Sequence, residues 1–261
     1  MKKLIRGVLF SIIVSTCAVN CTSVKKYSSA NAHSHNDYLN SQPFINAYNE
    51  GFGSIEADVF PIDGVLLVAH NKKDVQKQNT LQALYLDPLV AALRADNKRK
   101  LNLLIDVKEN HAEALNLLQK ELQPLMEYLS TAEKKKNITI SISGERPVPD
   151  EYSKYPGYIS FDDDLKLKHT PEQWKRVSLV SLQFDKITDW KGNDPILPAD
   201  YTRLKQIVDS VHTARKPIRF WAAPDTEEAW KQQMKLHVDF IGTDKINELA
   251  SFLRGKNKRA L

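Results

Sequence analysis

Three histidines and a Glu-x-Asp pair gather in one short segment of this 261-residue chain, at spacings that could serve catalysis. The segment reads AHSHNDYLNSQPFINAYNEGFGSIEADVFPIDGVLLVAH, and the residues of interest are His33, His35, Glu56, Asp58 and His70. Residues two apart on a β-strand point to the same face. Imidazole titrates near neutral pH and can transfer protons, whereas carboxylate oxygens suit hard cations. The segment therefore indicates a metal site, an acid/base pair, or both.

A third carboxylate lies on a later apolar run, LLIDVKEN, which contains Asp106 and, two residues further on, Lys108. Burying Glu56, Asp58 and Asp106 together is costly unless something neutralises their charge. A hard divalent cation does so, and carboxylate oxygens favour Mg²⁺ or Ca²⁺. Lys108, on the same strand face as Asp106, could hold an anionic group of a substrate.

Short apolar runs that alternate with helix-period segments must position these groups. Most of the runs are rich in Ile, Val, Leu or aromatic residues, which is typical of buried strands. The alternation of such runs with helices predicts a parallel sheet. The eight runs are the one leading into Ala32-His33 and those at 54–60, 101–107, 137–143, 157–161, 178–184, 217–223 and 238–242.

The segments between the runs carry apolar residues at helical spacing. One is interrupted at Pro88, the last is expected to end at Gly255 as a C-terminal cap, and Asp244 is expected to cap its start. Eight βα units in roughly 230 residues predict a single-domain α/β fold, the (β/α)8 TIM barrel. The helical segments are 80–97, 111–129, 201–214, 225–236 and 244–255.

The active site of a TIM barrel lies at the C-terminal ends of its strands. His33 would lie at the end of the first strand, and the three carboxylates on the second and third. A ninth extended run at 64–70 follows the turn PIDG and is expected to bring His70 back over the site. Since the carboxylates can hold the metal, His33 and His70 can act as an acid/base pair across a scissile bond.

The N-terminus, MKKLIRGVLFSIIVSTCAVNC, has the basic start and apolar run of a secretory signal and is short for a transmembrane helix. Cys17 and Cys21 are the only cysteines, and a thiol at the cleavage point suggests lipid attachment. We therefore expect an exported protein of the bacterial cell envelope, periplasmic or anchored as a lipoprotein. The predicted organisation is a signal peptide at 1–21, a polar linker at 22–31 and the barrel domain at 32–261.

The order of the candidate residues resembles the phospholipase-C-like phosphodiesterases with a TIM-barrel fold. That group includes glycerophosphodiester phosphodiesterases, phosphatidylinositol-specific phospholipases C and spider-venom sphingomyelinase D. GFGSIEADVFPIDGVLLVAH is similar to the glycerophosphodiesterase signature, and RFWAAPDTEEAWKQQMKLHVDFIGTD is similar to the last two strands of that family. HSHNDY resembles a further branch, the altered inheritance of mitochondria protein 6 type.

This resemblance implies a metal-dependent phosphoric diester hydrolase that acts on a phospholipid-derived or glycerophosphodiester-like substrate. The chain lacks the usual His-Arg-Gly and Pro-Glu-Asn-Thr elements of glycerophosphodiesterases. Either His33 or His35 could be the catalytic histidine; His33 follows a small residue, as the family histidine usually does, and is preferred. The implied roles are His33 and His70 as acid and base, Glu56, Asp58 and Asp106 as ligands of Mg²⁺ or Ca²⁺, and His35, Asn36, Lys108 and Trp221 as substrate contacts.

Two alternatives stay open. One is a non-catalytic, envelope-anchored binding protein on a degenerate barrel. The other is an amidohydrolase-type metal hydrolase, because His-x-His at the end of the first strand is a ligand motif there; the fifth and sixth apolar runs, however, lack the histidines that such a site needs. The net charge of +5 suits an anionic ligand or a lipid surface, and no nucleic-acid motif accompanies it.

Overall fold

Eight parallel strands form a nearly closed barrel in the residues that the computed structural model describes, 26–96 and 99–259. The strands are β1 (Ala32–Ser34), β2 (Ser54–Ile62), β4 (Leu101–Val107), β5 (Ile138–Gly144), β6 (Ile159–Asp163), β7 (Val177–Gln183), β8 (Ile218–Trp221) and β9 (Ile241–Thr243). Neighbours follow the order β8-β7-β6-β5-β4-β2-β1-β9. An isolated parallel bridge between Arg219 and Phe240 joins the two ends of this order. Each apolar run that the sequence analysis singled out contains or overlaps a strand.

The remaining strand, β3 (Val65–Val68), pairs antiparallel with the end of β2, as expected for the ninth run. Asp63 and Gly64 turn the chain with φ of 51° and 76°. Positive φ at both central residues is the requirement of a tight two-residue hairpin turn. This hairpin extends beyond the barrel and returns His70 toward the strand ends.

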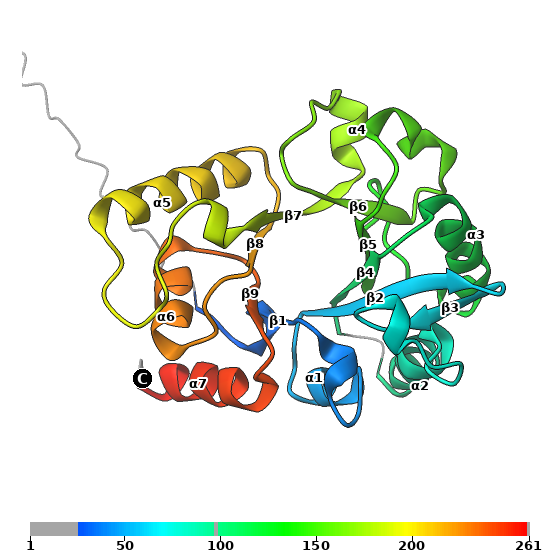
Figure 1. Cartoon of the computed structure of the whole chain (residues 1–261), viewed down its shortest axis with the longest axis horizontal. Coiled ribbons are helices and arrows are strands. Elements are labelled where there is room, and N and C mark those ends of the chain that lie inside the picture. The colour runs from blue at the N-terminus through cyan, green and yellow to red at the C-terminus, as the bar shows by residue number, and fades with distance from the viewer. Residues whose placement is uncertain (1–25, 97–98, 260–261) are drawn as a thin grey trace, which may run out of the picture.

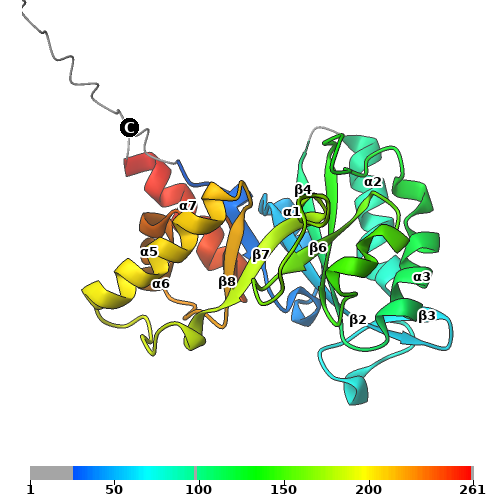
Figure 2. The same cartoon turned by 90° about the horizontal axis from the view of Figure 1, so that it is seen from above.

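Helices cover the barrel on two sides, with α2 and α3 next to β2 and β4 and with α5, α6 and α7 around β8 and β9 (Figure 1; Figure 2). A π-helical turn (Gln82–Leu86) leads directly into α2, so Pro88, which interrupts the periodic segment, lies in the first turn of α2. The helices are α1 (Ile45–Asn49), α2 (Asp87–Ala95), α3 (His111–Glu121), α4 (Pro171–Lys175), α5 (Pro198–Thr213), α6 (Glu227–Leu236) and α7 (Ile246–Arg259).

Two boundaries differ from the sequence-based expectations. Helix α7 continues through Gly255 to Arg259, so the prediction of a cap at Gly255 is wrong. The buried Leu249 and Leu253 pack the helix on the barrel, and this packing outweighs the low helix propensity of Gly255. The linker expected at 22–31 is partly folded, because Tyr27 is 3% exposed and its hydroxyl donates to the Val238 carbonyl at 2.5 Å.

The strands separate an apolar outer layer from a polar interior. On β2, Ile55, Ala57 and Val59 belong to the hydrophobic core beneath the helices, while the alternate residues Glu56 and Asp58 face the barrel axis. All five side chains are buried, so both faces of β2 are covered. No helix among the described residues is long and apolar enough to cross a membrane.

Candidate active site

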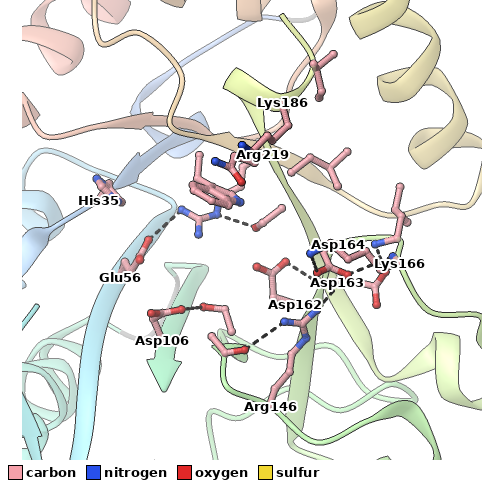
Figure 3. A pocket seen from close by; sticks show the side chains of 18 of the residues that line it. His35, Glu56, Asp106, Arg146, Asp162, Asp163, Asp164, Lys166, Lys186 and Arg219 are labelled. Carbon is pink, nitrogen blue, oxygen red and sulfur yellow. Dashed lines mark hydrogen bonds and ion pairs between the residues drawn. The ribbon is translucent and has the colours of Figure 1, made fainter. Parts of the chain in front are cut away.

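A cavity of about 700 Å³ opens at the C-terminal ends of the strands and reaches from β1 and β2 across to β6 and β7. Figure 3 shows His35, Glu56 and Asp106 on one side of it and Asp164, Lys166 and Lys186 on the opposite side. Its volume is within the range of ligand-binding pockets. His35, His70, Glu56 and Asp106 thus border a space large enough for a small organic substrate.

The three predicted carboxylates converge. One oxygen from each of Glu56, Asp58 and Asp106 lies within 4.8 Å of the other two. Strand register explains the convergence, because Asp58 on β2 pairs directly with Asp106 on β4 and Glu56 stands two residues earlier on the same face of β2. Ser143 on β5 donates to Asp106 at 2.6 Å and fixes its orientation.

Two cations partly offset this negative charge. Lys108 Nζ lies 2.7 Å from Asp58 and 2.5 Å from Asp106, and an Arg219 nitrogen lies 2.9 Å from Glu56. Burial raises the pKa of Asp58, and the negative charge of Glu56 raises it further, against the opposing effect of Lys108. Three carboxylates against two cations leave a net negative charge. The donor set therefore fits a hard divalent cation such as Mg²⁺ or Ca²⁺.

His35 is the first-strand histidine that lines the cavity. Its Nδ1 lies 2.7 Å from an Asp244 oxygen, and the Asn36 amide also donates to Asp244 at 3.3 Å. Burial alone would lower the pKa of His35, but the hydrogen bond to Asp244 and the charges of Glu56 and Asp244 outweigh it and raise that pKa. Asp244, expected as a helix cap, thus contacts His35 instead.

His70 reaches the same cavity from the end of the hairpin. Its Nδ1 lies 3.2 Å from an Asp58 oxygen and 3.1 Å from the Tyr38 hydroxyl, and its side chain is 56% exposed. The Tyr38 hydroxyl is also 2.8 Å from the same Asp58 oxygen and 2.7 Å from the Asn36 amide oxygen. Tyr38 therefore links His70 to Asp58, one of the three converging carboxylates.

His33 lies one layer deeper and does not line the cavity, because its side chain is fully buried inside the barrel. Its Nε2 is 2.8 Å from Glu56 and 2.6 Å from Arg219, and its Nδ1 is 2.8 Å from the Ser54 hydroxyl. The Asn102 amide donates to the Ser54 hydroxyl at 3.1 Å, so Ser54 links His33 to the next strand of the barrel. Burial and the charge of Arg219 lower the pKa of His33 to about 4.

The other residues of HSHNDY hold the loop between β1 and α1. Ser34 donates to Asp37 at 2.7 Å, and the Phe44 backbone N–H donates to the second Asp37 oxygen at 2.5 Å. Asp37 is fully buried. Within the motif, His33 therefore contacts Glu56, His35 lines the cavity, and Asp37 stabilises the loop.

The structure also places the remaining predicted contacts. Lys108 and Trp221 line the cavity, whereas Asn36 does not. The Asn36 amide instead donates to Asp244 and accepts from the Tyr38 hydroxyl. In the described part of the chain, the group that could hold a metal contains carboxylates alone, which does not match a histidine-rich amidohydrolase site.

The sequence analysis missed several cavity residues, above all Arg219 and Asp162. A charged residue in the middle of the apolar run PIRFWAA was the available signal for Arg219. Asp162 is buried, which raises its pKa to about 7 against the partly compensating charge of Arg219. For Asp162, the run FDDD gave no indication of which carboxylate points inward.

The fold and the site resemble those of the phospholipase-C-like phosphodiesterases with a TIM-barrel fold. The chain superposes on the crystal structure of a glycerophosphodiester phosphodiesterase from Parabacteroides distasonis with a TM-score of 0.53 at 15% identity, over 87% of this chain and 98% of that one. A glycerophosphoryl diester phosphodiesterase-like structure from Agrobacterium tumefaciens gives a TM-score of 0.51 at 14% identity, with the same coverage of both chains. Such distant similarity confirms the TIM-barrel fold.

Within that class, the resemblance to the altered inheritance of mitochondria protein 6 branch is confirmed. Residues 22–101 match the AIM6-like phosphodiesterase domain. The homologue from Arthroderma benhamiae is 28% identical over 82% of this chain and 81% of its own length. The Kluyveromyces lactis protein is 24% identical over 85% of this chain and 72% of its own.

These relatives correct the expected location. They are fungal proteins, which points to a eukaryotic protein, so the prediction of a bacterial cell envelope is wrong. The expected signal peptide at 1–21, with Cys17 and Cys21, lies outside the described residues.

Proposed function

We propose that this chain is a phosphoric diester hydrolase in which His35 and His70 transfer protons and Glu56, Asp58 and Asp106 hold a divalent cation. The observation that carries the proposal is the convergence of the three carboxylates beside two imidazoles that line the same cavity. All five of these side chains are present, whereas a degenerate, non-catalytic barrel is expected to have lost at least one of them.

A cation bound by the three carboxylates would stabilise negative charge on the phosphoryl oxygens. Lys108 lies between two of these carboxylates and also lines the cavity, so its ammonium can contact a phosphate oxygen. The substrate proposed is a phospholipid-derived or glycerophosphodiester-like anion, whose phosphate oxygens could contact Lys108, Arg146 or Lys186 at the cavity wall.

His35 is suited to be the acid. Its Nδ1 proton is directed to Asp244, which leaves Nε2 for the substrate, and the raised pKa of His35 favours its protonated form. His70, whose Nδ1 contacts Tyr38 and Asp58, is left to be the base through its Nε2. His70 takes the proton of the attacking hydroxyl as its oxygen bonds to phosphorus, and His35 gives a proton to the leaving oxygen as the other P–O bond breaks.

Asp244→Asn should lower kcat, but by a smaller factor than His35→Ala does. It should also move the alkaline limb of the pH–rate profile to lower pH. The reason is that the Asp244 carboxylate raises the pKa of His35, and the amide carries no charge. The measurement is kcat on a phosphodiester from pH 5 to pH 9.

Asp239→Asn is the matched control, because His212 Nε2 lies 2.7 Å from Asp239 and neither residue lines the cavity. That variant should keep the alkaline limb of the wild type. An alkaline limb that Asp244→Asn leaves in place would contradict the role of His35 as the acid.

The proposed function is tested with the purified full chain on bis(p-nitrophenyl) phosphate, glycerophosphodiesters, lysophospholipids and phosphatidylinositol. Each substrate is run with Mg²⁺, with Ca²⁺ and with chelator, beside His35→Ala and Glu56→Gln. We expect turnover that requires a cation and that both variants abolish or nearly abolish. Turnover that survives chelation and both substitutions would refute the site, and absence of turnover on the whole panel would favour a binding protein.

A further inference from the structure

The cavity does not end at the catalytic groups. On the side of β6, β7 and α5 it is lined by leucine and isoleucine side chains from four different segments. Three of these, Leu182 on β7, Ile187 after β7 and Ile207 on α5, are half-buried and pack on the hydrophobic core. Because each packs against the hydrophobic core, these three side chains form an ordered apolar surface on this side of the cavity. The fourth, Leu165, follows β6. We call the part of the cavity lined by Leu165, Leu182, Ile187 and Ile207 the apolar limb.

Leu165 is the unusual member of the limb. Its side chain is 44% exposed, and its backbone has a φ of 62°, a left-handed conformation that leucine rarely adopts. The conformation is held by Asp163, whose carboxylate accepts from the Leu165 N–H at 2.8 Å. Asp163 is itself buried and lies 3.1 Å from His169. A buried carboxylate thus holds a large apolar side chain at the cavity in a conformation that costs free energy.

The two sides of the cavity therefore differ in chemistry. Glu56, Asp106 and His35 lie on one side, and Asp164, Lys166 and Lys186 lie on the opposite side (Figure 3). The apolar limb lines the cavity next to these last three charged residues. A substrate that is only a small polar diester would leave the limb in contact with water. A substrate with a hydrocarbon substituent would cover it and remove its apolar surface from solvent.

We propose that the apolar limb binds the hydrocarbon substituent of an amphiphilic phosphodiester while the phosphate lies at the carboxylates. The proposal rests on the proposed function of the same site and narrows its substrate class from phosphodiesters in general to those that carry an alkyl or acyl chain. Beside the limb, Lys166 is paired with Asp164 at 2.8 Å, and Lys186 offers a positive charge to an anionic amphiphile.

The test uses methyl, butyl and octyl p-nitrophenyl phosphate, which share one reacting centre and differ in the alkyl group alone. Each buried methylene gains up to about fourfold in binding, so kcat/KM of the full-length wild type should rise by about tenfold or more from methyl to octyl. Binding of methyl and octyl phosphate, by calorimetry below micellar concentrations, gives a readout that does not require turnover and should show the same preference.

Leu165→Asn is the variant of choice. Asparagine has a similar size, is polar and tolerates a left-handed φ better than leucine does, so the fold should be kept or stabilised. We expect the preference for octyl over methyl to fall several-fold. Leu167→Asn is the matched control, since Leu167 lies in the same loop, is 53% exposed and does not line the cavity.

The outcomes separate the two proposals. A chain-length preference in binding that Leu165→Asn reduces and Leu167→Asn keeps would support the limb, even if none of the diesters is turned over. Equal binding and equal kcat/KM for methyl and octyl compounds in the wild type would overturn the limb and leave the phosphodiesterase proposal standing. A preference that Leu165→Asn leaves intact would also overturn it.

Discussion

Replacing His35 with alanine should lower kcat on a phosphodiester by about 10²- to 10⁴-fold, the usual contribution of a general acid or base. His33→Asn should lower kcat far less when the cation is saturating, because His33 is fully buried and contacts Glu56 rather than the cavity. Its main effect should be on the free energy of unfolding, by about 1–3 kcal/mol, since it leaves buried polar partners unpaired. The measurements are steady-state kinetics and urea unfolding of both variants.

Added imidazole sharpens this comparison. The His35 side chain is 38% exposed and borders the cavity, so imidazole can enter the space left in His35→Ala and should restore part of kcat. The corresponding space in His33→Ala is closed to solvent and should give no rescue. A larger catalytic loss at His33 than at His35, with rescue at His33, would reverse the assignment.

Arg219→Met should destabilise the fold by about 3–5 kcal/mol, because it leaves the Glu56 carboxylate buried without its charge partner. The Arg219 side chain is 6% exposed, lies 2.9 Å from Glu56 and also donates to Ser181 at 2.8 Å. Burial would raise the pKa of Glu56, but the charge of Arg219 and the His33 hydrogen bond outweigh it and hold that pKa below its ordinary value. Urea unfolding at pH 7 in the presence of chelator measures the loss.

Two further variants serve as controls for Arg219→Met. The double variant Glu56→Gln/Arg219→Met should recover part of the lost stability, because the Glu56 charge is no longer buried without its partner. Arg254→Met removes the partner of Glu50 from an exposed pair and should cost less than about 1 kcal/mol. A loss for Arg219→Met no greater than that for Arg254→Met would contradict the buried ion pair.

The barrel could be predicted from the sequence because its strands are short apolar runs separated by helical periodicity. The run at 101–107 coincides with β4, and its neighbours shift by one or two residues. The end of α7 could not be predicted in the same way. Gly255 is a local stop signal, whereas the packing of Leu249 and Leu253 against the barrel is a tertiary effect that outweighs it.

The carboxylate site could also be predicted, since Glu56, Asp58 and Asp106 follow from strand alternation and order alone. Alternation could not choose between His33 and His35, because residues two apart share a face and differ in depth. Depth depends on register with the neighbouring strands: His33 pairs with Ser54 and Gly242 within the sheet, whereas His35 comes after β1 has ended.

The most direct test of the account is the rate of bis(p-nitrophenyl) phosphate hydrolysis by chelator-stripped protein as Mg²⁺ or Ca²⁺ is restored. Wild type and Asp106→Asn are compared at the same concentrations. The account predicts no turnover without the cation, a saturable rise as it is added to the wild type, and a much weaker response in Asp106→Asn. Equal rates with and without the cation, or equal responses of the two proteins, would contradict a metal-dependent site built from these carboxylates.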